Sequence, residues 1–140
     1  MNISTKGRYG LEAVVDIARH SNGGQNVVPL KSVSQRQGVS QNYLQQIITL
    51  LKHAGIVGSV RGVDGGYFLA LPAEEITVGS VLRTLEGHLA PAGCAVDSEP
   101  VCEGEPQCST CSTRFVWNSM FGIINKVVDN ITIADILKES

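Results

Sequence analysis

Four cysteines in the second half of the 140-residue sequence carry its most distinctive chemistry. They follow the spacing C-x7-C-x5-C-x2-C and are Cys94, Cys102, Cys108 and Cys111. They are too clustered to cross-link a whole domain, and nothing in the sequence indicates an oxidising compartment, so metal or redox chemistry is favoured over structural disulfides. Thiolates select zinc or iron-sulfur clusters over hard cations. Because the two wide gaps fit the paired spacing of structural zinc sites poorly, the order of preference is an iron-sulfur cluster, then zinc, then thiols without metal.

A second group of polar residues suits contact with nucleic acid. The exposed positions of a predicted helix over residues 41–54 carry uncharged hydrogen-bonding groups that can reach base edges or phosphate oxygens, and Thr49 is among these positions. Arg61 stands at the base of a glycine-containing connection, where a guanidinium can enter a narrow minor groove. An ordinary solvated helix face is the alternative. The predicted DNA-binding residues are Lys31, Arg36, Ser40, Gln41, Asn42, Tyr43, Gln45, Gln46, Arg61, Gly62, Gly65 and Gly66.

Two helices joined by a tight turn would position most of these residues. Residues 30–37 are predicted to form a short helix that Gly38 closes in a left-handed conformation. Ser40 is predicted to cap the helix over 41–54. The apolar side chains of that helix fall on one stripe, which consists of Leu44, Ile47, Ile48 and Leu51. This arrangement predicts a helix-turn-helix.

The segments around this motif complete a small domain. Thr5 is predicted to cap a helix that ends near His20. After the helix-turn-helix, β-prone runs at 56–60 and 67–70 flank a connection with three glycines, which predicts a β-hairpin. The predicted fold is therefore mainly α with a small β-hairpin, a winged helix-turn-helix over residues 1–72.

The charge distribution supports a division of labour between two halves. The net charge is −2, but residues 1–71 contain seven Lys and Arg against three Asp and Glu, whereas residues 72–140 contain four against ten. A basic half joined to an acidic half is expected where one part meets a polyanion. No apolar stretch is long enough to cross a bilayer, and Met1 to Gly10 lacks the apolar core of a secretory signal. We therefore expect a cytoplasmic protein without membrane contact.

The second half, residues 73–140, is predicted to hold the cysteine loop and the dimerisation helices. Thr77 is predicted to cap a helix over 78–86, and Thr132 with Asp135 resembles a capping arrangement for a last short helix. Between them a helix over about 110–129 carries a continuous apolar stripe, too large for one small domain to cover, which predicts a homodimer. The stripe consists of Val116, Met120, Ile123, Ile124, Val127 and Val128, flanked by Phe115, Trp117 and Phe121.

Three segments of the sequence resemble the Rrf2 family of winged-helix transcription regulators. They are residues 3–10 (ISTKGRYG), residues 39–46 (VSQNYLQQ) and residues 59–67 (SVRGVDGGY), and the resemblance extends over nearly the whole chain. It implies a homodimer that binds palindromic or near-palindromic operator DNA, with the long C-terminal helices crossing at the interface.

The resemblance also bears on the cysteines. It implies that Cys94, Cys102 and Cys108 bind a [2Fe-2S] cluster, as in the cluster-binding members. Cys111 occupies the position where those members carry a histidine as fourth ligand. A thiolate there would give a more negative site with a lower reduction potential. The alternative is that Cys111 is not a ligand and that another residue or a small thiol takes the fourth position. Another branch of the family lacks a cluster and regulates cysteine metabolism through a partner enzyme.

No nucleophile with a matching base is recognisable, so we expect no enzyme. The main hypothesis is a DNA-binding transcription regulator whose operator affinity depends on a [2Fe-2S] cluster and which senses iron-sulfur, redox or nitric-oxide status. One alternative is a zinc- or thiol-based redox regulator of the same fold. Others are a cluster-free regulator of cysteine metabolism that acts through a partner protein, and an interaction protein whose winged helix contacts protein.

Overall fold

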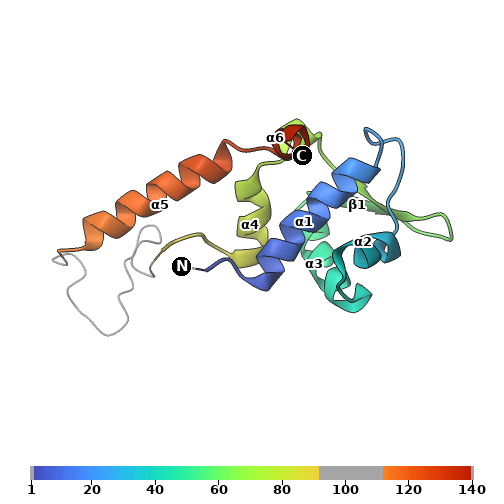
Figure 1. The fold of residues 1–140 in the computed structure, drawn as a ribbon, viewed down its shortest axis with the longest axis horizontal. Coiled ribbons are helices and arrows are strands. Elements are labelled where there is room, and N and C mark those ends of the chain that lie inside the picture. Colours follow the sequence, from blue (N-terminus) through green and yellow to red (C-terminus); the bar gives the residue numbers. More distant parts are fainter. Residues whose placement is uncertain (1, 92–111, 140) are drawn as a thin grey trace.

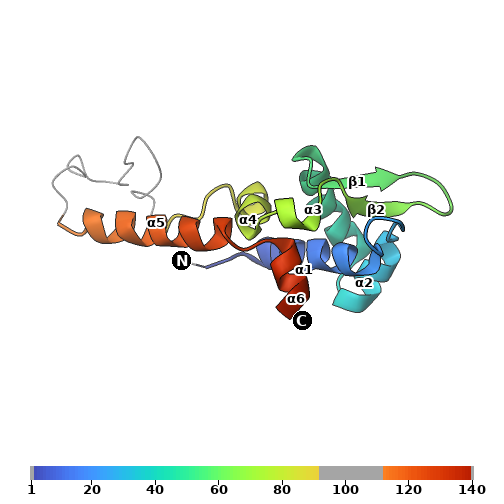
Figure 2. The same cartoon turned by 90° about the horizontal axis from the view of Figure 1, so that it is seen from above.

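The computed structural model of the protein describes residues 2–91 and 112–139. The molecule is elongated, with the hairpin extending at one end and α5 at the other (Figure 1 and Figure 2). None of the described helices is long and apolar enough to cross a bilayer. In chain order the elements are α1 (Thr5–His20), α2 (Leu30–Gln37), α3 (Gln41–His53), β1 (Val57–Val60), β2 (Gly66–Leu69), the short 3-10 helix η1 (Ala73–Glu75), α4 (Val78–Glu86), α5 (Arg114–Asp129) and α6 (Ile133–Glu139).

Capping side chains fix the N-terminal ends of four of the described helices, α1, α3, α4 and α6. Ser4, and not the predicted Thr5, caps α1, because its side chain accepts a hydrogen bond from the backbone of Gly7 and Thr5 is already helical. Ser40 and Thr77 cap α3 and α4 as predicted. The start of α6 is fixed by a reciprocal pair, in which the Thr132 N–H donates to the carboxylate of Asp135 and the Asp135 N–H donates to the Thr132 hydroxyl.

The predicted helix-turn-helix and hairpin are both present, and the winged-helix prediction is confirmed. Gly38 closes α2 with φ of 72°, in the left-handed region. β1 and β2 pair antiparallel, with Val57 opposite Leu69 and Ser59 opposite Tyr67. β1 begins at Val57, one residue after the predicted start, and ends at Val60 as predicted. β2 begins and ends one residue earlier than the predicted 67–70. α3 likewise ends at His53, one residue before the predicted end.

A close backbone contact holds the hairpin against the loop before α2. The N–H of Val28 donates to the carbonyl of Tyr67, and the N–H of Tyr67 donates to that of Val28, each at 2.8 Å. A Cβ on Gly66 would lie 2.6 Å from the backbone of Val28. Since backbone cannot move aside as a flexible side chain can, only glycine permits this approach.

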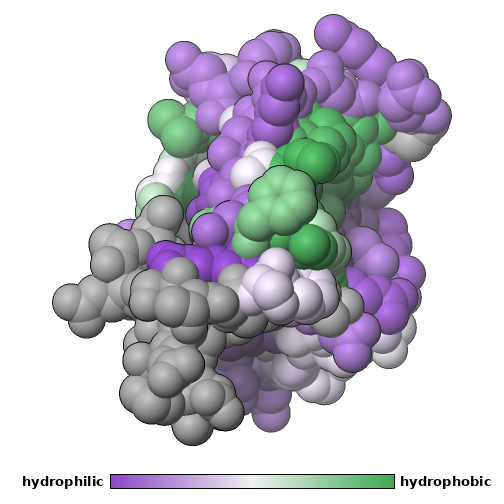
Figure 3. Space-filling view, turned by 90° about the vertical axis from the view of Figure 1, so that its left-hand side faces the viewer, coloured by the Kyte–Doolittle hydropathy of each residue, from purple (hydrophilic) through white to green (hydrophobic). Residues whose placement is uncertain are grey.

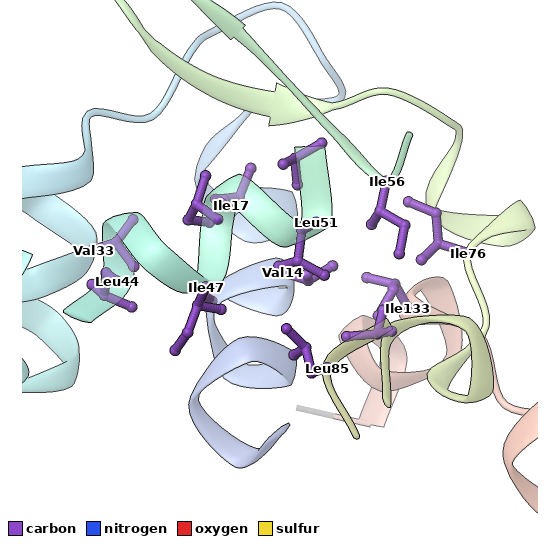
Figure 4. Packing of buried hydrophobic residues seen from close by; sticks show 14 of the residues in the cluster. Val14, Ile17, Val33, Leu44, Ile47, Leu51, Ile56, Ile76, Leu85 and Ile133 are labelled. Atoms are coloured by element: carbon purple, nitrogen blue, oxygen red, sulfur yellow. The ribbon is translucent and has the colours of Figure 1, made fainter. Parts of the chain in front are cut away.

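One hydrophobic core joins the two halves of the chain. The predicted stripe of α3 is buried, and it packs with Val14 and Ile17 of α1 (Figure 4). Ile76, Leu85 and Ile133 from the second half lie in the same cluster. The division at residue 72 stays a prediction, but the packing of the winged domain depends on residues that follow it.

α5 is attached to the rest of the molecule mainly through its C-terminal half. Arg83 of α4 donates to both carboxylate oxygens of Asp129 and to the side chain of Asn125. Ile124 and Val128 pack on a small apolar cluster formed by α4 and Leu89. No residue of α5 is buried among those described. The helix therefore extends from the body with much of its surface open.

The predicted apolar stripe lies on this open surface. Phe115 is 75% exposed and Ile123 63% exposed, and Val116, Met120 and Val127 are also exposed. Figure 3 shows hydrophobic side chains gathered on the end of the molecule that α5 forms, next to hydrophilic surroundings. Ile124 and Val128 at one edge of the stripe pack on α4 and Leu89, but one chain leaves the other side chains of the stripe exposed.

Candidate nucleic-acid interface

A polar groove of about 480 Å³ lies between the start of α2, one face of α3 and the hairpin. Lys31, Lys52 and Arg61 supply positive charge, and no carboxylate occurs among the described residues that line it. Seven of the predicted DNA-binding residues line this groove, namely Lys31, Gln41, Gln45, Arg61, Gly62, Gly65 and Gly66. A groove with cations, amides and no acid is suited to a polyanion.

The remaining predicted residues of α3 have different surroundings. Asn42 and Gln46 are exposed beside the groove. The hydroxyl of Ser40 accepts the N–H of Tyr43 at 3.2 Å as the helix cap. The Tyr43 ring is half-buried and meets the ring of Tyr9 edge-on, with centroids 6.1 Å apart. Tyr43 therefore contributes to the packing of α3 on α1.

Arg36 forms an ion pair inside the protein. Its Nε and Nη2 donate to the carboxylate of Asp16 at 2.8 and 2.6 Å. The hydrogen bonds to Asp16 raise the pKa of the guanidinium above its ordinary value, against a smaller opposing effect of burial. Arg36 lines a separate hollow of about 350 Å³ with residues of α1 and α6. Arg36 is thus not among the residues that line the groove, and its contact with DNA stays a prediction.

Six residues that line the groove were not predicted from the sequence, and two of them, Lys52 and Tyr67, carry groups that can contact a ligand. Lys52 lies seven residues after Gln45, which is two helical turns along α3, so helical periodicity gave a usable indication. Tyr67 lies opposite Ser59 in the hairpin, and its hydroxyl donates to the side chain of Gln45 at 3.2 Å. Only the spatial approach of hairpin and helix reveals that contact.

The predicted cluster ligands lie outside the described residues. All four, Cys94, Cys102, Cys108 and Cys111, fall within 92–111. In the part of the chain that the structure describes, no group of three or more His, Cys, Asp or Glu side chains is arranged to hold a metal ion. The predicted ligand set therefore rests on the sequence and on the chemistry of its four thiols.

Glu86, the last residue of α4, contacts the residue that caps α1. The carboxylate of Glu86 accepts the N–H of Ser4 at 2.9 Å and also contacts its hydroxyl. Gly7 of α1 packs so closely here that a Cβ would meet the Glu86 side chain. This contact joins the N-terminal end of α1 to the C-terminal end of α4. α1 also packs on α3.

Comparisons with known proteins agree over the full chain. The Rrf2 family model, described as an iron-dependent transcriptional regulator, matches residues 3–139. The chain is 36% identical over 143 residues to the HTH-type transcriptional regulator IscR of Vibrio campbellii, covering 100% of this chain and 79% of that protein. Both the sequence segments quoted above and the helical stripe fall within the matched residues.

Solved structures of two kinds of regulator resemble the fold. CymR, the global cysteine regulator of B. subtilis, aligns with a TM-score of 0.80 and 34% identity, covering 100% of this chain and 98% of that one. IscR of T. potens aligns with a TM-score of 0.77 and 40% identity, covering 99% and 88%. Together with the family match, these similarities establish that the chain belongs to the Rrf2 family of transcriptional regulators.

Proposed function

We propose that the protein is a homodimeric regulator that binds operator DNA through the groove between α3 and the hairpin, and whose operator affinity depends on a cluster held by its cysteines. The groove itself supports the DNA-binding step. It combines three cations with the amides of Gln41 and Gln45, and no carboxylate lines it among the described residues. α3 would enter the major groove while Arg61 of the hairpin reaches the adjacent minor groove.

The DNA-binding step is tested with a duplex recovered by the purified protein from a pool of randomised 30-base-pair duplexes. Neutralising Arg61 or Lys52 removes a cation from the groove, so Arg61→Ala and Lys52→Ala should each weaken binding and lower the slope of log affinity against log salt by about one. Lys138→Ala on α6, where the side chain is exposed, is the matched control and should leave the slope unchanged. Equal slopes for all four proteins would exclude this groove as the DNA-binding surface.

Homodimer formation is proposed from the exposed stripe of α5. A helix that extends from its own domain with large apolar side chains exposed can bury them against the same stripe of a second copy. Two copies related by a two-fold axis would present two α3 helices, which suits a palindromic operator.

The cluster proposal rests on the donor set. Three cysteines and a fourth at the end of the segment supply soft thiolate ligands for a [2Fe-2S] cluster, which would give the protein a site that changes with iron supply or oxidation. Glu86 ends α4, which precedes that segment in the chain, and its contact with Ser4 joins α4 to α1, which packs against α3. A change at the segment can therefore alter the placement of α3 if the two states differ in free energy.

This part of the proposal is tested by purification without oxygen and by measurement of iron, sulfide, zinc and visible absorption. About two iron and two sulfide per chain, with operator affinity that changes when the cluster is removed, are the expected results. Zinc without sulfide would favour zinc-based regulation. A metal-free protein after attempted reconstitution would favour a thiol-based or cluster-free regulator. The structural similarity to CymR of B. subtilis supports the cluster-free alternative.

A further inference from the structure

The side chain of Gln45 is held from both sides within the groove. Its Nε2 donates to the hydroxyl oxygen of Thr49 at 3.3 Å, one helical turn further along α3. Its Oε1 accepts the hydroxyl of Tyr67 from the hairpin at 3.2 Å. Gln45 itself remains exposed. The amide therefore spans between helix and wing while one edge stays open to a ligand.

The directions of these two hydrogen bonds follow from a third hydrogen bond, which the Thr49 hydroxyl makes with the backbone of Gln45. The Thr49 hydroxyl donates its single hydrogen to the backbone carbonyl of Gln45 at 2.7 Å, and a carbonyl can only accept. The Thr49 oxygen must then accept from the amide, so the NH₂ group of Gln45 faces Thr49. The amide oxygen consequently faces Tyr67, whose hydroxyl must donate.

An amide held in this way has one fixed pair of unused hydrogen-bonding groups. Its NH₂ group has two hydrogens and its oxygen two lone pairs, and the contacts with Thr49 and Tyr67 use one of each. One hydrogen of the NH₂ group and one lone pair of the oxygen are then left for a ligand. In the major groove, adenine presents the complementary pair, with N6 as donor and N7 as acceptor, whereas guanine presents two acceptors.

We propose that Tyr67 and Thr49 are positioning residues that fix the amide of Gln45 so that it reads an adenine of the operator. The inference rests on the proposed DNA-binding function and adds to it the base that is read and the two residues that set the specificity. The hydrogen bond between Tyr67 and Gln45 joins β2 to α3. Recognition of that base would therefore depend on the position of the hairpin.

The base in question is located by measurement. Each base pair of the duplex recovered from the randomised pool is replaced in turn, and affinities of the wild type and Gln45→Ala are compared. The position where only the wild type discriminates should be an A·T pair, and Gln45→Ala should lose about 5- to 150-fold of discrimination there. Replacing that adenine by 7-deazaadenine, which lacks the N7 acceptor, or by purine, which lacks the N6 amino group, should each weaken wild-type binding.

Removal of single hydroxyls tests the positioning role. Tyr67→Phe and Thr49→Val should each reduce discrimination at this one base pair by about 2- to 12-fold while leaving discrimination at the other positions intact. In the double variants with Gln45→Ala, neither change should have a further effect at that position, because the groups act through the amide. Tyr9→Phe, the same chemical change on a half-buried ring of α1, is the matched control.

The possible failures are distinct. A position read by Gln45 that is not an A·T pair, unchanged discrimination in Tyr67→Phe and Thr49→Val, or a uniform loss at every position would overturn the inference while salt-dependent DNA binding persists. No retention of any duplex at low salt by the folded wild type would instead overturn the proposed DNA-binding function. A melting curve for each variant establishes that the fold is intact.

Discussion

The groove and the α5 stripe differ in how complete they are within one chain. In the groove, polar side chains already have partners from the same chain, as the contacts of Gln45 with Tyr67 and Thr49 show. On α5, large apolar side chains are exposed and no described residue of the same chain covers them. The groove proposed to read DNA is thus assembled within one chain, whereas the surface proposed for dimerisation needs a second copy to cover it.

The largest expected effect comes from a charge placed in the α5 stripe. Ile123→Glu should convert the proposed homodimer into a monomer, because burial of the stripe against a second copy would then also bury two carboxylates. The monomer should keep its helical content, since Ile123 is 63% exposed within one chain. Sedimentation velocity across a concentration series measures the change, and circular dichroism measures the helical content.

Its control lies on the opposite side of the same helix. Asn118→Glu adds the same charge to α5 at an exposed position away from the stripe, and should leave the dimer intact. A wild-type protein that is monomeric at every concentration would contradict the comparison directly. Unfolding of Ile123→Glu would show instead that the stripe is needed within one chain.

Two glycine replacements, one in the hairpin and one on α5, should change the free energy of unfolding in opposite directions. Gly66→Ala brings a Cβ within 2.6 Å of the Val28 backbone and should lower the free energy of unfolding by about 1–3 kcal/mol. It should also weaken DNA binding because it displaces the wing. Gly122→Ala on α5 meets no atom within 4 Å and should raise the free energy of unfolding by about 0.5–1 kcal/mol. Urea unfolding of both variants measures the difference, and a neutral Gly66→Ala would show that the wing is loosely held.

The elements were predictable from the sequence wherever a local rule determines them. Gly38 and Ser40 delimit α2 and α3 through backbone conformation and capping, which depend on a few neighbouring residues. The apolar stripe of α3 was predicted in full because helical spacing determines which residues share a face. The cap of α1 was placed one residue late, since Ser4 and Thr5 are equally good capping residues in sequence.

The site was predictable only in part, because partners distant in sequence decide what a polar residue does. Arg36 was predicted to contact DNA, and no sequence pattern indicated that Asp16, twenty residues earlier, binds its guanidinium within the protein. Tyr67 was not predicted as a groove residue, because its contact with Gln45 depends on how the hairpin packs beside α3. Sequence patterns identify which side chains are polar and exposed on an element. They do not reveal the tertiary pairings that orient or engage them.

The smallest expected effect concerns acid stability at the junction of α5 and α6. Hydrogen bonds from the backbone and then the side chain of Thr132 hold the pKa of Asp135 below its ordinary value of 3.8. A carboxylate with a lowered folded-state pKa stabilises the fold above the unfolded pKa, and that contribution is lost as pH falls through the folded pKa. Asp135→Asn should therefore lower the melting temperature slightly at neutral pH, and the difference from wild type should shrink below pH 3.8.

Asp64→Asn, at an exposed carboxylate in the hairpin connection, is the matched control. A difference from wild type that stays constant with pH would show that the capping pair of α6 does not depend on the charge of Asp135.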